Sequence, residues 1–142
     1  MQTVPFEVFK ELGDKDLLFI DSSHTVKPGG DVNYLILEVL PRLEKVIVHF
    51  HDIFLPYDYQ RSILQTFFHW TETSLLRAFL IWNEKVRIIF CLSQLHYDYR
   101  ALKEVFPEYN PQLDKDGIRD EKYKPFENPK EHFPSSIYIQ IQ

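Results

Sequence analysis

The sequence predicts an α/β protein with a largely parallel sheet, and three observations lead to this fold class. Short apolar runs of strand length recur along the chain. Between them lie segments whose apolar residues repeat at helical spacing. The last segment, 136–142, alternates polar with apolar residues, as strands with one buried face do. Because strands that alternate with amphipathic helices form α/β folds, we expect residues 1–142 to make a single domain of this class.

The elements of the first part begin with a short helix. Pro5 suits a first helical turn, and the apolar residues of Phe6–Leu12 follow at helical spacing. The continuous apolar run Leu17–Ile20 predicts a strand that is buried on both faces. A longer helix comes next, because the segment Val32–Leu43 carries an apolar stripe for one helical face. The members of this stripe are Val32, Leu35, Ile36, Val39, Leu40 and Leu43.

The second part continues the alternation up to the carboxyl terminus. The predicted elements are a strand at Lys45–Phe50, a helix at Thr71–Asn83, a strand at Val86–Leu92, a helix around Leu95–Phe106 and a strand at Ser136–Gln142. Residues 107–134 are rich in charge, contain five prolines and show no periodicity. We therefore expect a long irregular segment before the last strand.

Composition excludes several classes of function. Sixteen Lys and Arg against twenty-one Asp and Glu give a net charge of −5, which argues against a protein that binds the phosphate backbone of nucleic acids. The single cysteine, Cys91, excludes a disulfide framework and is expected to be inert core. The four glycines, at positions 13, 29, 30 and 117, cannot form a glycine-rich phosphate-binding loop.

Targeting signals are also missing from the sequence. The first residues lack a basic segment followed by an apolar stretch, so we expect no secretory signal. The apolar runs are far shorter than the roughly 20 residues that a membrane-spanning helix needs. We therefore expect a soluble cytoplasmic protein with no membrane partner.

Two groups of chemically active residues come directly after predicted strands. The motif D-S-S-H runs from Asp21 to His24, and H-F-H-D ends the next strand with His51 and Asp52. Ligands of α/β sheets bind beyond the carboxyl ends of the strands, so Asp21 and Asp52 should lie close together if these strands are neighbours. Two carboxylates and an imidazole suit a hard divalent cation such as Mg²⁺ or Mn²⁺. His24 can then take the proton of a cation-bound hydroxyl.

Other roles for these residues stay open on the sequence alone. Asp21 is equally suited to capping the turn after its strand, and His24 to lying solvated in a loop. His51 either binds the cation or hydrogen-bonds a neighbouring loop. Tyr57 and Tyr59 either line a substrate pocket or pack their own loop against the domain.

Three motifs occur in order along the chain: F-I-D-S-S-H at residues 19–24, L-P-R-L at 40–43 and V-H-F-H-D-I-F-L-P at 48–56. Together they resemble class I S-adenosylmethionine-dependent methyltransferases, most closely a bacterial branch similar to metal-dependent O-methyltransferases. The resemblance covers about residues 2–142. It implies a seven-stranded Rossmann-like sheet, of which this chain supplies the carboxyl-terminal half: three parallel strands and an antiparallel last strand, flanked by helices.

The resemblance also implies roles for the residues at the strand ends. In metal-dependent relatives, an aspartate after the fourth strand and an acidic pair after the fifth hold the cation, which corresponds here to Asp21 and Asp52. His51 stands where relatives often have a carboxylate, and His24 would be the general base. The implied reaction transfers a methyl group from S-adenosylmethionine to a hydroxyl of a sugar or natural product, assisted by Mg²⁺ or Mn²⁺.

The family binds its cofactor mainly with its first three strands, which have no counterpart in this sequence. We therefore expect a partial methyltransferase domain, incomplete as this chain alone, to which no cofactor-binding residue is assigned. Strand Leu17–Ile20 would then be an exposed apolar edge that a second copy or another chain covers. The alternative function is a non-catalytic remnant that serves as an oligomerisation or interaction module. A third hypothesis is a metal-dependent hydrolase that uses the same His and Asp residues.

Overall fold

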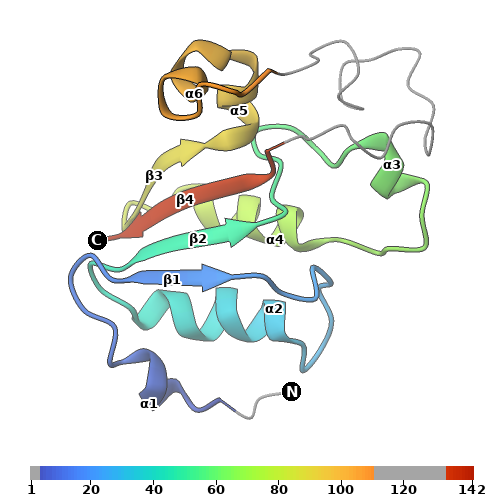
Figure 1. The fold of residues 1–142 in the computed structure, drawn as a ribbon. Coiled ribbons are helices and arrows are strands. Elements are labelled where there is room, and N and C mark those ends of the chain that lie inside the picture. Colours follow the sequence, from blue (N-terminus) through green and yellow to red (C-terminus); the bar gives the residue numbers. More distant parts are fainter. Residues whose placement is uncertain (1–3, 111–133) are drawn as a thin grey trace.

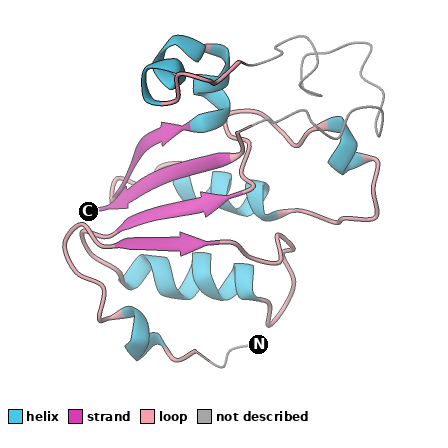
Figure 2. Ribbon diagram, in the orientation of Figure 1, coloured by secondary structure: helices cyan, strands magenta, loops and turns pink. Residues whose placement is uncertain are grey.

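A computed structural model describes residues 4–110 and 134–142, which fold into a four-stranded sheet with helices packed against it (Figures 1 and 2). The elements in chain order are α1 (Phe6–Phe9), β1 (Leu17–Ile20), α2 (Asp31–Asn33) with a π-helical continuation (Tyr34–Val39) and a 3₁₀ turn (Leu40–Arg42), β2 (Ile47–His51), α3 (Arg61–Leu64), α4 (Glu72–Leu80), β3 (Val86–Cys91), α5 (Leu92–Tyr97), α6 (Tyr99–Val105) and β4 (Ser136–Ile141). The irregular segment expected at 107–134 lies mostly outside the described residues.

The strands are arranged in the order β1-β2-β4-β3. β1 and β2 pair in parallel, whereas β4 lies between β2 and β3 and pairs antiparallel with both. The expectation of three parallel strands is therefore wrong for the hydrogen-bonded pairs, because only β1 and β2 pair in parallel in the described sheet. The reason is that the last strand returns through the middle of the sheet and separates β3 from the strands that run in its direction.

One face of the sheet forms the core together with the helices. Alternate strand residues such as Ile20, Phe50 and Ile139 are at most 4% exposed and pack in one cluster with the helical segment 31–42 and with α4. The predicted stripe of the 31–42 helix faces this core: five of its six members are buried, and Leu35 is partly buried. Cys91 also belongs to the core, as expected, and burial raises the pKa of its thiol.

The other face of the sheet is open at β1. Leu17 and Phe19 are each 53% exposed, so the prediction that this strand is buried on both faces is wrong. An apolar run predicts burial of both faces only where helices cover both, and β1 is an edge strand whose packed face carries Ile20. Within the described residues, no helix is long and apolar enough to cross a membrane.

An aromatic row crosses this open face. The Phe19 ring lies 4.9 Å from the His49 ring, which stacks on Tyr138 at 4.1 Å, and Tyr138 lies 4.4 Å from Phe90. The His49 ring also hydrogen-bonds Ser136 at 3.0 Å. Burial, together with the nearby His51 charge, lowers the pKa of His49. His49 is thus part of the sheet surface and not of the residue group at the strand ends.

Candidate functional site

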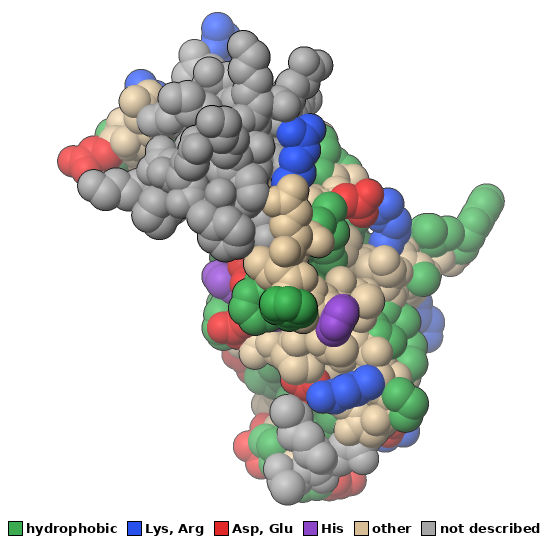
Figure 3. All heavy atoms as spheres, turned by 90° about the vertical axis from the view of Figure 1, so that its right-hand side faces the viewer, with side chains coloured by type: hydrophobic (Ala, Val, Ile, Leu, Met, Phe, Trp, Pro, Cys, Tyr) green, Lys and Arg blue, Asp and Glu red, His purple; other side chains and the backbone are tan. Residues whose placement is uncertain are grey.

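The parallel pairing of β1 with β2 brings the two polar motifs to one edge of the sheet. Ile20 and Phe50 are register partners, so Asp21 and His51 follow them side by side. Figure 3 looks onto the side of the molecule at which β1 and β2 end, and histidine lies beside acidic side chains on its left. This edge is where the sequence predicted the site.

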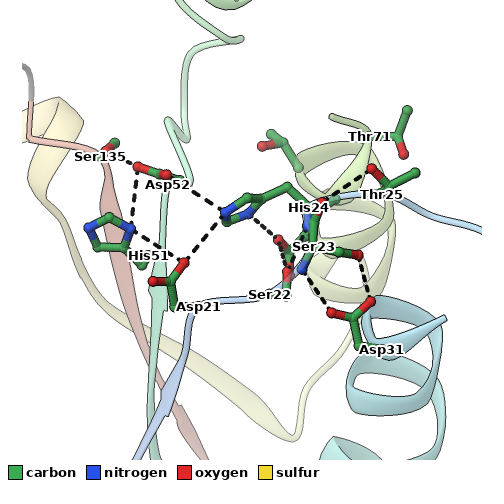
Figure 4. A network of polar contacts seen from close by, with 12 residues as sticks. Asp21, Ser22, Ser23, His24, Thr25, Asp31, His51, Asp52, Thr71 and Ser135 are labelled. Atoms are coloured by element: carbon green, nitrogen blue, oxygen red, sulfur yellow. Dashed lines mark hydrogen bonds and ion pairs between the residues drawn. The ribbon is translucent and has the colours of Figure 1, made fainter. Parts of the chain in front are cut away.

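Four side chains meet there, and we call Asp21, His24, His51 and Asp52 the strand-end cluster (Figure 4). The Nε2 atom of His24 lies 3.5 Å from Asp21 Oδ1 and 3.7 Å from Asp52 Oδ2. The Nδ1 atom of His51 lies 3.4 Å from Asp52 Oδ1 and 3.8 Å from Asp21 Oδ1. The structure therefore brings together the four residues that the two motifs singled out.

Two members of the cluster have a left-handed backbone, with φ of 54° at His24 and 55° at Asp52. Asp and His adopt this region more often than most residues, yet it costs of order 1–3 kcal/mol for a residue other than glycine. Such a conformation persists only where surrounding contacts hold it. At His24 these contacts come from the start of α4.

His24 is attached to α4 through both its ring and its backbone. The ring Nδ1 lies 2.8 Å from Glu72 Oε2, and the carbonyl oxygen accepts the N–H groups of Thr71 and Glu72. The Trp70 ring lies 4.4 Å from the imidazole. These contacts bury the His24 side chain to 7% exposure while its Nε2 atom faces Asp21 and Asp52.

The charges around His24 raise its pKa. Burial on its own lowers the pKa of His24, because it disfavours the charged ring. The hydrogen bond to Glu72 and the negative charges of Glu72, Asp52 and Asp21 outweigh burial, so that the net direction is upward. A raised pKa makes this imidazole a stronger proton acceptor than an exposed histidine.

The loop between β1 and α2 is fixed by Asp31, the first residue of α2. Its carboxylate accepts the Ser23 backbone N–H at 2.8 Å and the Ser23 hydroxyl at 2.6 Å. Burial on its own raises the pKa of Asp31, but the hydrogen bonds from Ser23 and from the backbone lower it overall. Asp31 thereby holds the segment in which His24 lies.

The donor chemistry of the cluster suits a divalent cation. Asp52 Oδ1 accepts a hydrogen bond from Ser135 at 2.9 Å, which orients its carboxylate. His51 Nδ1 is buried and has no hydrogen-bond partner among the described residues, although it faces both carboxylates. A buried nitrogen without a partner is costly unless a ligand satisfies it. In the described part of the chain, however, no group of three or more His, Cys, Asp or Glu side chains is arranged so that it could hold a metal ion.

The two tyrosines of the following loop lie outside the cluster. The Tyr59 hydroxyl accepts the Thr73 N–H, and its ring packs 5.8 Å from the Trp70 ring, which in turn contacts His24. Burial raises the pKa of Tyr59. Tyr57 packs against Tyr97 at 5.1 Å. The contacts of both rings are those of residues that pack their loop against the rest of the domain.

Sequence reasoning missed Glu72, Trp70 and Ser135. Glu72 is separated from His24 by 48 positions and has the pattern of an ordinary acidic residue in a first helical turn. Trp70 follows two exposed phenylalanines in an aromatic run with no periodicity, and Ser135 precedes a strand whose place in the sheet was unknown. The start of α4 was predicted at Thr71, but without the strand order nothing in the sequence places that start beside His24. Comparisons with known protein families, curated proteins and solved structures found no match.

Proposed function

We propose that this chain is the acceptor-activating part of an S-adenosylmethionine-dependent O-methyltransferase. The observation that carries the proposal is the environment of His24. Its ring is anchored at Nδ1 by a buried carboxylate, and its Nε2 faces two more carboxylates at the carboxyl ends of parallel strands. A nitrogen base next to acidic ligands at this edge of an α/β sheet suits deprotonation of a bound hydroxyl.

In the proposed reaction, His24 Nε2 takes the proton from the acceptor hydroxyl as the oxygen becomes a nucleophile. When bound, S-adenosylmethionine would supply an electrophilic methyl group to the acceptor oxygen and would leave as S-adenosylhomocysteine. Asp21, Asp52 and His51 would hold a Mg²⁺ or Mn²⁺ ion, whose charge makes a nearby hydroxyl easier to deprotonate. The acceptor class proposed from the resemblance is a sugar or a natural product.

The arrangement of the strands supports this proposal. The resemblance implies that the last strand of the sheet runs antiparallel to the others, and β4 does so. We infer that β1, β2 and β3 correspond to the fourth, fifth and sixth strands of the Rossmann-like methyltransferase sheet, and β4 to the seventh. The proposal includes the cytoplasmic location expected from the sequence.

A second candidate, an oligomerisation or interaction module, is favoured by the open side of β1. Leu17 and Phe19 are half exposed on an edge strand, which offers both apolar side chains and free backbone groups to another chain. This candidate requires nothing of the strand-end cluster. It predicts no bound cation and unchanged stability when Asp21 and Asp52 are replaced by Asn.

Calorimetry tests the proposed function. S-adenosylmethionine and, separately, its demethylated product are titrated into the folded chain in Mg²⁺ and in a chelator. Measurable binding that is stronger with the cation would support activity of the chain by itself, and the His24→Gln variant should retain it because His24 acts on the acceptor. If neither ligand releases heat under either condition, the chain alone is an incomplete enzyme, and the proposed function then depends on cation binding, which the interaction module does not predict.

A further inference from the structure

Glu72 is a buried carboxylate whose two oxygens have different surroundings. Its Oε2 atom accepts the Ser22 hydroxyl at 2.7 Å and lies 2.8 Å from His24 Nδ1, whereas Oε1 is buried without a hydrogen-bond partner among the described residues. The whole residue is 1% exposed. Burying a carboxylate is unfavourable unless hydrogen-bond donors compensate the lost hydration, and the contacts with Ser22 and His24 supply this compensation.

The contact between Glu72 and His24 determines which ring nitrogen carries hydrogen. An ionised carboxylate only accepts hydrogen bonds, so a nitrogen at 2.8 Å from it must donate. In a neutral imidazole only one nitrogen has a hydrogen, and the other has a lone pair. With the hydrogen on Nδ1, the lone pair of His24 is on Nε2, the atom that faces Asp21 and Asp52.

We propose that Glu72 is a positioning residue that holds neutral His24 in the Nδ1–H tautomer and thereby presents the Nε2 lone pair to the acceptor. The proposal rests on the proposed function, in which Nε2 takes the acceptor's proton. A carboxylate that orients a histidine base in this way also stabilises the ring once it has become charged. Trp70 and the two backbone N–H groups at the start of α4 fix the ring and the carbonyl of the same residue.

A purely structural role for Glu72 has a different consequence. The same carboxylate also binds Ser22, whose oxygen accepts the backbone N–H of His24 at 3.0 Å, so Glu72 shapes this loop as well. If shaping the loop were its whole function, the ring of His24 would be free to take either tautomer. The tautomer is therefore the quantity that separates the two roles.

Nitrogen-15 NMR of the histidine side chains measures this tautomer directly. Spectra are recorded at a pH at which His24 is neutral, and its signals are identified by their loss in His24→Gln. We expect wild-type His24 to show a protonated Nδ1 and an unprotonated Nε2. Glu72→Leu replaces the carboxylate by an apolar side chain of similar size that cannot accept a hydrogen bond. In this variant we expect the signals to shift to the Nε2–H form that free imidazole side chains favour.

Ser22→Ala is the matched control, because it removes the other hydrogen bond to the same Oε2 atom and leaves the Nδ1 contact in place. We expect its His24 to stay in the Nδ1–H form. A wild-type spectrum with hydrogen on Nε2 overturns the proposal even if Glu72→Leu does not fold, and so does an unchanged tautomer in Glu72→Leu. The measurement needs neither cofactor nor acceptor, so its result is independent of whether the chain binds S-adenosylmethionine.

Discussion

At the scale of single residues, His24 connects the strand-end cluster to the start of α4. Its backbone and ring are held by the first turn of α4, and the free edge of the ring faces the ends of β1 and β2. The left-handed backbone at His24 is tolerated because these contacts hold it. The geometry of the cluster therefore depends on Glu72 as well as on the residues of the two motifs.

Asp31 gives a prediction about how stability depends on pH. At pH 7, Asp31→Asn should lower the free energy of unfolding by about 1 kcal/mol, a small value because the hydrogen bonds from Ser23 are exposed. The hydrogen bonds lower the pKa of Asp31 below its usual 3.8, so its stabilising effect is complete above that pH and is lost as the pH falls through the lower folded value. The difference between wild type and variant should therefore shrink in strongly acidic solution.

Urea unfolding at pH 7, 5 and 3 measures this difference. The values at pH 7 and 5 should agree, and the value at pH 3 should be smaller. A difference that stays the same at pH 3 would mean that the carboxylate charge of Asp31 does not fix the loop.

Much of the site could be predicted at this scale, but only the part that is local in sequence. Asp21 and His24 share one motif and His51 and Asp52 another, and the rule that ligands bind at the carboxyl ends of strands brings the two motifs together. Glu72 escaped because its partner lies 48 positions away and because acidic residues are common in first helical turns for other reasons. The tautomer of a histidine depends on such a partner, so it could not be predicted either.

At the scale of elements, periodicity identified most helices and strands, and failed where burial depends on neighbours. The long apolar run of β1 predicted burial on both faces, but its position at the edge of the sheet leaves Leu17 and Phe19 half exposed. The predicted helix Leu95–Phe106 is instead two helices, α5 and α6, separated at Asp98. The short helix α3 was not predicted, because its sequence has too few residues to show a period.

Two substitutions on β1 test the corrected description of this strand. Ile20→Ala removes a side chain that is 4% exposed in the core, and should lower the free energy of unfolding by about 2–3 kcal/mol. Leu17→Ala is the matched control, because Leu17 is 53% exposed on the opposite face, and it should cost less than about 1 kcal/mol. Both are measured by urea unfolding with an unchanged dependence on denaturant. Equal losses would contradict the assignment of an open face to β1.

At the scale of the whole molecule, the sheet has an edge strand, β1, whose exposed face is apolar. Backbone groups of β1 alternate in direction, and Ile47 N–H binds Asp16 on the β2 side, so the groups of Leu17 and Phe19 point away from the sheet. A second copy that pairs antiparallel with this edge can bring Leu17 opposite Phe19 of that copy on the same face. The expectation that a second chain covers β1 stays a prediction.

Light scattering at high protein concentration tests this expectation. We predict a dimer for the wild type and a shift towards monomer for Phe19→Lys, because a charge on an edge strand opposes pairing with another strand. Ile89→Lys serves as the control, since Ile89 is a 41% exposed residue of the other edge strand, β3. A wild type that is monomeric at every concentration contradicts the prediction.

Mn²⁺ binding is the sharpest test of whether the strand-end cluster binds a cation beside a proton-accepting histidine. Electron paramagnetic resonance measures free Mn²⁺ in solutions of the wild type, Asp21→Asn, Asp52→Asn and Asp58→Asn, the last being a control whose side chain is 84% exposed. We expect the wild type and the control to bind the ion equally. We expect at least about tenfold weaker binding in the other two variants, since the loss of a residue that merely orients a ligand already costs that much. Equal binding by all four proteins, or none by the wild type, would contradict cation binding at the cluster.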